Sequence, residues 1–132
     1  MAFLHNLSAF FIYFVSAMGL MAVFMAIYLH ITPHAEIAQI RRGNMAATVA
    51  LLGAVLGFAL PLASCIAHSV SVVDMVIWAL VALVVQVLAY FLSSRLVPQL
   101  TDGIDQGNVS HGAFLGGVAL TVGVVNAACM VY

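Results

Sequence analysis

The sequence predicts an all-α membrane protein with four transmembrane helices, arranged as two tandem helical hairpins that share one orientation. Its composition and an internal repeat are the two observations behind this fold class. Of the 132 residues, 66% are hydrophobic and only 5% are charged, whereas an average soluble domain carries about 25% charged residues. So few charges do not cover a surface that faces water, and we therefore expect most of the surface to face lipid.

The apolar residues lie in four long runs, and each run is long enough to cross a bilayer. A helix needs about 20 apolar residues to span the roughly 30 Å hydrocarbon layer. A closed β-barrel would alternate apolar and polar residues, and these runs do not. The first run has no Lys or Arg before it and exceeds a signal-peptide core of about 7–15 residues, so we expect it to be retained. The predicted helices cover about Ala2–Leu29, Met45–Ala67, Val70–Leu92 and Val109–Val131.

Two segments that lie 64 residues apart are nearly the same, which indicates a duplication. Ile40-Arg41-Arg42-Gly43-Asn44 precedes the second apolar run, and Ile104-Asp105-Gln106-Gly107-Asn108 precedes the fourth. The chain is therefore predicted to contain one two-helix repeat over residues 1–68 and a second over residues 69–132, packed as one compact domain. Because each repeat crosses the membrane twice, both copies keep the same orientation.

The three positively charged residues all follow the first or the third predicted helix. Arg41 and Arg42 lie in the first connector, Arg95 lies in the third, and these two connectors share one face of the membrane. The positive-inside rule places that face in the cytoplasm. We therefore expect both termini on the outer side.

The two cytoplasmic connectors, residues 31–43 and 95–107, have the same design. Each begins near a proline and carries apolar residues at helical spacing, which is typical of a short amphipathic helix at the membrane interface. These apolar residues are Ile37 and Ile40 in the first connector, and Leu100 and Ile104 in the second. Each connector ends in Gly-Asn, where glycine closes the short helix, and Asn44 or Asn108 caps the next one.

Several short motifs carry a resemblance to a known family. They are Thr32-Pro33-His34, Arg42-Gly43-Asn44-Met45-Ala46-Ala47, Leu60-Pro61-Leu62 and Asn126-Ala127-Ala128-Cys129-Met130. With these motifs the whole chain resembles the YjfL-like bacterial inner-membrane proteins, a family of unknown function designated DUF350 or UPF0719. The resemblance implies a four-span protein of the bacterial plasma membrane, and it supplies no catalytic residues.

Small residues mark the expected helix contacts, because helices in lipid associate through close packing. Gly53 and Gly57 lie on one face of the second helix, and the repeat places Gly117 and Thr121 at the equivalent positions of the fourth. The fourth helix carries a further row of small residues: Gly112, Gly116, Ala119, Gly123 and Ala127. This row either packs within one chain, which is the simpler interpretation, or faces a neighbouring subunit.

Few polar residues lie within the predicted spans. Gln86 is near the middle of the third helix, Thr48 near the inner end of the second, and Asn126 toward the outer end of the fourth. An interhelical hydrogen bond, worth about 0.6–2 kcal/mol, is the simplest role for Gln86. The three residues are also the candidate lining of a polar pathway beside a bend at Pro61. No charged residue lies at mid-span, which argues against a proton-coupled or ion-coupled carrier.

The sequence predicts no metal, cofactor or catalytic site. His30 and His34 lie near the first connector, but Pro33 between them interrupts a simple pair of ligands. For Cys65 and Cys129 we expect apolar packing rather than a disulfide, and no CxxC spacing supports a zinc site. No nucleophile and base can be paired. The net charge of −1 argues against nucleic acid as a partner.

Two functions are consistent with these features. The leading hypothesis is a non-enzymatic membrane protein that forms homo-oligomers in lipid and offers its connectors, residues 31–43 and 95–107, to a cytoplasmic protein partner. The alternative is a channel or small-solute transporter with a pathway near Gln86, Asn126 and Pro61.

Overall fold

The computed structural model describes residues 2–32 and 36–130, and this part of the chain consists of helices joined by short loops. There are four long helices and two short ones: α1 (Ala2–Ile31), α2 (Glu36–Arg41), α3 (Met45–His68), α4 (Val72–Leu96), α5 (Leu100–Asp105) and α6 (Val109–Cys129). The four long helices are apolar and long enough to cross a membrane. The predicted all-α class with four spans is therefore confirmed, whereas the division into repeats 1–68 and 69–132 stays a prediction.

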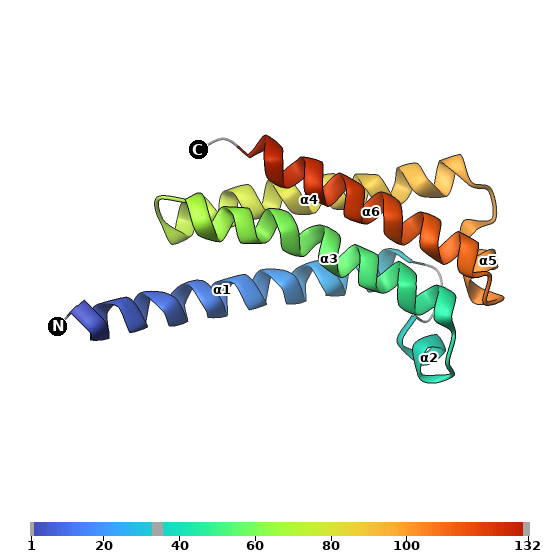
Figure 1. Cartoon of the computed structure of the whole chain (residues 1–132), viewed down its shortest axis with the longest axis horizontal. Helices are drawn as coiled ribbons and strands as arrows, with labels where there is room; N and C mark the ends of the chain where they lie inside the picture. Colours follow the sequence, from blue (N-terminus) through green and yellow to red (C-terminus); the bar gives the residue numbers. More distant parts are fainter. Residues whose placement is uncertain (1, 33–35, 131–132) are drawn as a thin grey trace.

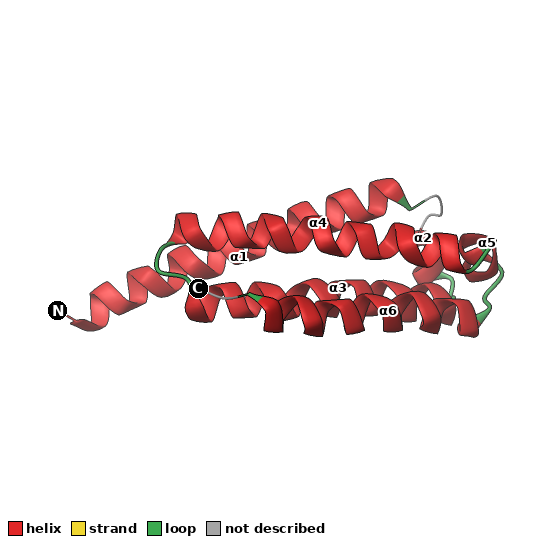
Figure 2. Ribbon diagram, turned by 90° about the horizontal axis from the view of Figure 1, so that it is seen from above, coloured by secondary structure: helices red, strands yellow, loops and turns green. Residues whose placement is uncertain are grey.

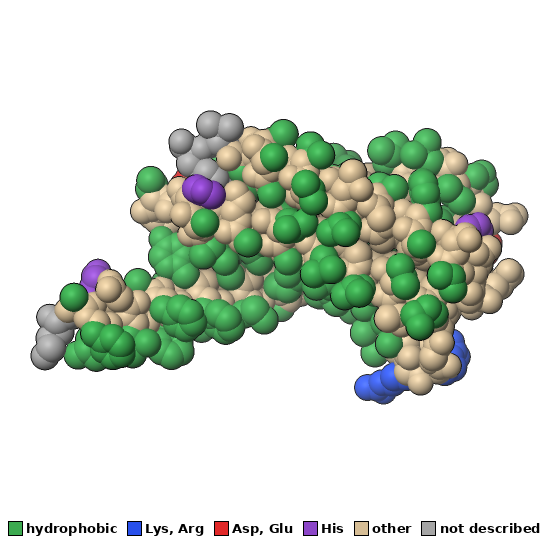
Figure 3. Space-filling model, in the orientation of Figure 1, with side chains coloured by type: hydrophobic (Ala, Val, Ile, Leu, Met, Phe, Trp, Pro, Cys, Tyr) green, Lys and Arg blue, Asp and Glu red, His purple; other side chains and the backbone are tan. Residues whose placement is uncertain are grey.

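The helices form two layers. Helices α3 and α6 lie side by side in one layer, and α1 and α4 cover them in the other (Figure 2). The short helices α2 and α5 lie together at one end of the bundle, and both termini point toward the other end (Figure 1). Arginine side chains gather at the α2 end, while apolar side chains cover α1 (Figure 3).

The contact between α3 and α6 is the closest in the bundle, and it is built from glycines. A methyl group at Gly53 would overlap the backbone of Gly116, and one at Gly112 would overlap the backbone of Ala46. The helix backbones approach each other equally closely at Gly57 and Gly123, since a methyl group at Gly123 would overlap the Gly57 carbonyl. The two backbones therefore touch directly, which only small residues permit.

Pro61 lies inside α3 and is buried in this contact. A proline has no N–H, so it donates no hydrogen bond to the carbonyl four residues earlier, which is that of Gly57. This carbonyl faces Gly123 across the interface. Cα–H groups of a close helix are weak donors to such an oxygen, so the close approach at Gly123 compensates in part for the missing bond.

Gly117 differs from the other glycines that were predicted to pack. Nothing lies within 4 Å of a methyl group placed on it, and Thr121 is exposed. The expected equivalence with Gly53 and Gly57 therefore fails within the chain. Successive residues turn by about 100° around a helix, and α6 presents the row that contains Gly116 and Gly123 to α3, which turns Gly117 outward.

Helix α1 packs on the bundle mainly through its C-terminal half. Its buried residues, Ala17, Leu20, Phe24 and Tyr28, recur every three or four positions and form one face. Phe24 stacks on Phe58 of α3 with ring centroids 4.6 Å apart. The N-terminal half of α1 diverges from the bundle (Figure 1), so its apolar surface is open to lipid.

We predict that Gly123→Ala lowers the stability of the folded protein. The added methyl group would meet the Gly57 backbone, and overpacking of this kind costs roughly 1–3 kcal/mol. Gly19→Ala is the matched control, because nothing lies within 4 Å of that position, and alanine favours a helix over glycine by about 1 kcal/mol. Unfolding in detergent, followed by circular dichroism, measures both. Equal stability of the two variants would contradict the packing described here.

Candidate functional site

Polar side chains join the two connectors at the end of the bundle where α2 and α5 lie. Gln39 Nε2 donates a hydrogen bond to Asp105 Oδ1 at 2.5 Å. Asn44 Nδ2 donates to Gln39 Oε1 at 3.1 Å and to the carbonyl of Ile104 at 2.8 Å. The bonds from Gln39 to Asp105 and from Asn44 to Ile104 cross from the first connector to the second, so the two short helices are held as one surface.

The two predicted capping asparagines have the same backbone conformation, φ −73° and ψ 102°. Asn44 Oδ1 accepts from the N–H of Ala47 at 3.2 Å, and Asn108 Oδ1 accepts from the N–H of Ser110 at 3.1 Å. The glycines before them are left-handed, with φ values of 83° and 82°. Asn44 is half-buried and Asn108 is exposed, so only Asn44 combines capping with bonds between the connectors.

Glu36 is a buried carboxyl group at the start of α2, with 1% of its surface exposed. Thr32 Oγ1 lies within hydrogen-bonding distance of two acceptors, 2.7 Å from Glu36 Oε1 and 3.0 Å from the carbonyl oxygen of Tyr28. Burial raises the pKa of Glu36 to about 7, while the hydrogen bond from Thr32 opposes the rise. The structure therefore places an ionisable group inside the protein, at the connector end of the bundle.

Our reading of the sequence missed the inward positions of Glu36 and Gln39. It predicted an apolar face containing Ile37, but Ile37 is 45% exposed, whereas Glu36 and Gln39 are buried. One feature of the sequence did indicate that position 36 is buried. The 64-residue offset aligns Glu36 with Leu100, an apolar residue, and so marks position 36 as a buried one.

Each of the candidate pathway residues makes a separate hydrogen bond in the structure. Gln86 Nε2 donates from α4 to the carbonyl of Ala119 in α6 at 3.1 Å. Asn126 Nδ2 donates in the other direction, to the carbonyl of Ala82 at 3.3 Å. Thr48 Oγ1 bonds within its own helix, to the carbonyl of Asn44 at 3.0 Å. Gln86 and Asn126 thus hold α4 against α6, which is the role that lipid favours for such residues.

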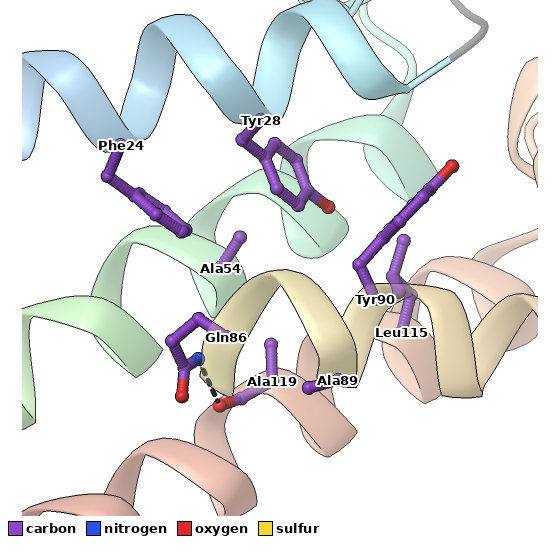
Figure 4. Close-up of a pocket in the computed structure, with 8 residues that line it drawn as sticks. All are labelled: Phe24, Tyr28, Ala54, Gln86, Ala89, Tyr90, Leu115 and Ala119. Atoms are coloured by element: carbon purple, nitrogen blue, oxygen red, sulfur yellow. Dashed lines mark hydrogen bonds between the residues drawn. The ribbon is translucent and has the colours of Figure 1, made fainter. Parts of the chain in front are cut away.

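A small cavity of about 10 Å³ lies among the four long helices (Figure 4). Its lining is mostly apolar and aromatic: Phe24, Tyr28, Ala54, Gln86, Ala89, Tyr90, Leu115 and Ala119. Within the described part of the chain, Tyr28 Oη and Gln86 Oε1 are buried without a hydrogen-bond partner. The volume suits about one water molecule.

The histidine and cysteine candidates are dispersed. Across residues 2–32 and 36–130, no three His, Cys, Asp or Glu side chains are grouped closely enough to hold a metal ion. His34, one of the candidates, lies outside the described residues. Cys65 is buried, with its Sγ 3.5 Å from Met130 Sδ, whereas Cys129 is exposed, and the described part of the chain forms no disulfide with either.

We predict that Asn44→Ala destabilises the protein more than Asn108→Ala. Each substitution removes a helix cap, worth about 1 kcal/mol. Only the first also removes the bonds to Gln39 and Ile104, each worth about 1 kcal/mol. Thermal unfolding in the same detergent measures the difference. Equal destabilisation would show that the bonds between connectors contribute nothing.

The comparisons with known proteins agree with this architecture. The family model described as Domain of Unknown Function (DUF350) matches residues 2–130. The chain is 38% identical over 132 residues to the UPF0719 inner membrane protein YjfL of Escherichia coli K12, and equally to that of E. coli O157:H7, with complete coverage of both chains in each case. No solved structure matches. The resemblance inferred from the sequence motifs is confirmed, and the chain belongs to the DUF350 family of multi-pass inner-membrane proteins.

Proposed function

We propose that this inner-membrane protein is a non-enzymatic assembly protein. In this proposal it forms homo-oligomers through the outward face of α6 and presents its two joined connectors to a cytoplasmic protein partner. The observation that carries the proposal is a second row of small residues on α6, which the fold of a single chain leaves uncovered.

The uncovered row consists of Ala113, Gly117 and Thr121, which recur at four-residue spacing. All three are exposed, and nothing lies within 4 Å of a methyl group placed at Gly117. Together with Phe114, Val118 and Val122 they line a shallow groove of about 410 Å³. Small residues at this spacing let a second helix approach closely in lipid. Thr121 Oγ1 donates to the carbonyl of Gly117 at 2.8 Å, so the hydroxyl in the groove is already satisfied.

Contact with lipid alone would not require small residues. The exposed face of α1 carries large side chains, among them Phe10, Phe14 and Met18, and such a face suits mobile acyl chains. The α6 face has the opposite character, and it resembles the inward α6 face that contacts α3. This contrast supports a helix of another subunit as the occupant of the groove.

The connectors offer a polar surface for a partner. A groove of about 310 Å³ lies between them, lined by Arg42, Gly43, Asn44, Asp105, Gln106 and Gly107. Arg41 and Arg95 are also exposed. The positive-inside rule supports a cytoplasmic position for this end and an outer position for both termini. The mixture of positive, negative and amide groups suits a protein surface better than nucleic acid.

The hydrogen bonds at depth support assembly over the channel alternative. Gln86 and Asn126 are used to join α4 to α6. The cavity beside Gln86 has room for about one water molecule. A conducting path would need these polar groups to face a continuous aqueous space.

We predict that Gly117→Leu lowers the oligomeric state without unfolding the subunit. The leucine has open space in the single chain but fills the groove that a partner helix would occupy. Gly116 and Gly123 are unsuitable for this test, because both pack inside the chain. Gly19→Leu, at another open helical position, is the control for added bulk.

Native mass spectrometry from detergent and cross-linking in native membranes measure this effect. We expect the dissociation constant of the oligomer to rise about tenfold or more, which corresponds to a loss of about 1.4 kcal/mol. The proposal fails if the wild type is monomeric in membranes, or if Gly117→Leu and Gly19→Leu assemble as the wild type does.

For the transport alternative, we expect reconstituted vesicles to show no flux of small ions above that of empty vesicles. Fluorescent indicators inside the vesicles measure the flux. Sustained flux that Gln86→Leu abolishes would favour the channel and would count against the assembly role.

A further inference from the structure

The two connector helices occupy corresponding places but bury different side chains at their first residue. Helix α2 begins at Glu36 and α5 begins at Leu100, 64 positions later. Both residues are buried, with exposed fractions of 1% and 2%. The apolar side chain of Leu100 therefore fills this buried position in α5. A carboxyl group is costly to bury, so packing alone does not explain Glu36.

Among the described residues, three side chains with hydroxyl groups lie near Glu36. Thr32, directly after α1, hydrogen-bonds to its carboxyl group, and the phenols of Tyr28 in α1 and Tyr90 in α4 lie within electrostatic range of it. Helix α3, which also packs against α2, carries its titratable side chains, Cys65 and His68, at the opposite end. On α2 itself, Arg41 is exposed.

The two phenols within electrostatic range of Glu36 also border the interior cavity. Tyr28 and Tyr90 pack edge to face with ring centroids 5.7 Å apart, and both line the water-sized cavity. The Tyr28 hydroxyl points from α1 toward Tyr90, and the Tyr90 hydroxyl points away from Gln86 (Figure 4). Tyr28 Oη is buried and has no partner within the described part of the chain. This hydroxyl, which can both donate and accept a hydrogen bond, lies within electrostatic range of the carboxyl group.

We propose that Glu36 is a proton-binding site open to exchange with the cytoplasm, and that loss of its proton loosens α2 from the bundle. The carboxylic acid transfers its proton to water at the connector end, leaving a carboxylate and a hydronium ion, and no other bond changes. The neutral acid suits the buried site, while the carboxylate favours a hydrated position. This inference goes beyond the assembly role and holds whether or not the chain forms oligomers.

The direction of the pKa shift agrees with this geometry. The pKa of Glu36 rises from 4.5 to about 7, so the folded protein binds this proton roughly a few hundredfold more tightly than an exposed glutamate does. The folded state therefore holds more protons between these two pH values. The stability that this proton contributes is complete below about pH 4.5 and is lost as the pH rises through about 7.

Infrared spectroscopy of the full chain in lipid vesicles tests the proposal. The carbonyl band of a protonated carboxylic acid should disappear with a midpoint near pH 7 and should be absent from Glu36→Gln. Glu36→Leu copies the residue at Leu100 and is expected to fold while also lacking the band. Asp102→Asn, at an exposed carboxyl group, should leave the band unchanged. The variant His34→Gln is a control that separates titration of Glu36 from titration of the histidine two positions earlier in the sequence.

A spin label at position 37 tests the loosening of α2, since Ile37 is already 45% exposed and Cys129→Ser removes the exposed native thiol. Its mobility should increase as the pH rises through about 7 in the wild-type background and should not respond to pH in Glu36→Leu. A carbonyl band that survives in Glu36→Gln, or that titrates in the ordinary range of glutamate, would overturn the proton site. A label whose mobility does not change with pH would contradict the proposed loosening of α2.

Discussion

The direct contact between the backbones of α3 and α6 is the constraint on which the rest of this structure depends. Glycines on both helices remove the side chains that would hold them apart. Once this pair is fixed, one side of it accepts α1 and α4, and the connectors α2 and α5 meet at one end (Figures 1 and 2). The same contact leaves the opposite side of α6 bare, with Gly117 open.

Lipid changes the role of polar groups in this fold. In a bilayer, burial of apolar surface contributes little to the free energy of helix association. Close packing and a few hydrogen bonds must therefore hold the helices together. Gln86 and Asn126 connect α4 to α6 near two different depths. A hydrogen bond between Gln39 and Asp105 joins the two connectors. Gln86 and Asn126, which first suggested a pathway, thus make hydrogen bonds between helices, and we propose the α6 groove and the connector end as the functional surfaces.

Much of the architecture could be predicted from the sequence, because lipid demands long apolar helices. The second apolar run was predicted to cover Met45–Ala67, and α3 covers Met45–His68. The rotation of α6 could not be predicted, since two rows of small residues compete for the contact and only three-dimensional packing selects between Gly116 and Gly117. The inward position of Glu36 was also hidden, because α2 has 6 residues, too few for periodicity to define a face.

Cross-linking within one chain tests the α3–α6 contact most directly. Ser64 Oγ lies 3.4 Å from the carbonyl of Ala127, so these two positions face each other near the ends of α3 and α6. With the native cysteines replaced, oxidation of Ser64→Cys/Ala127→Cys in native membranes should form a disulfide inside each single chain, whatever the oligomeric state. Cross-links that form only between chains, or not at all, would contradict the helix pair on which this account is built.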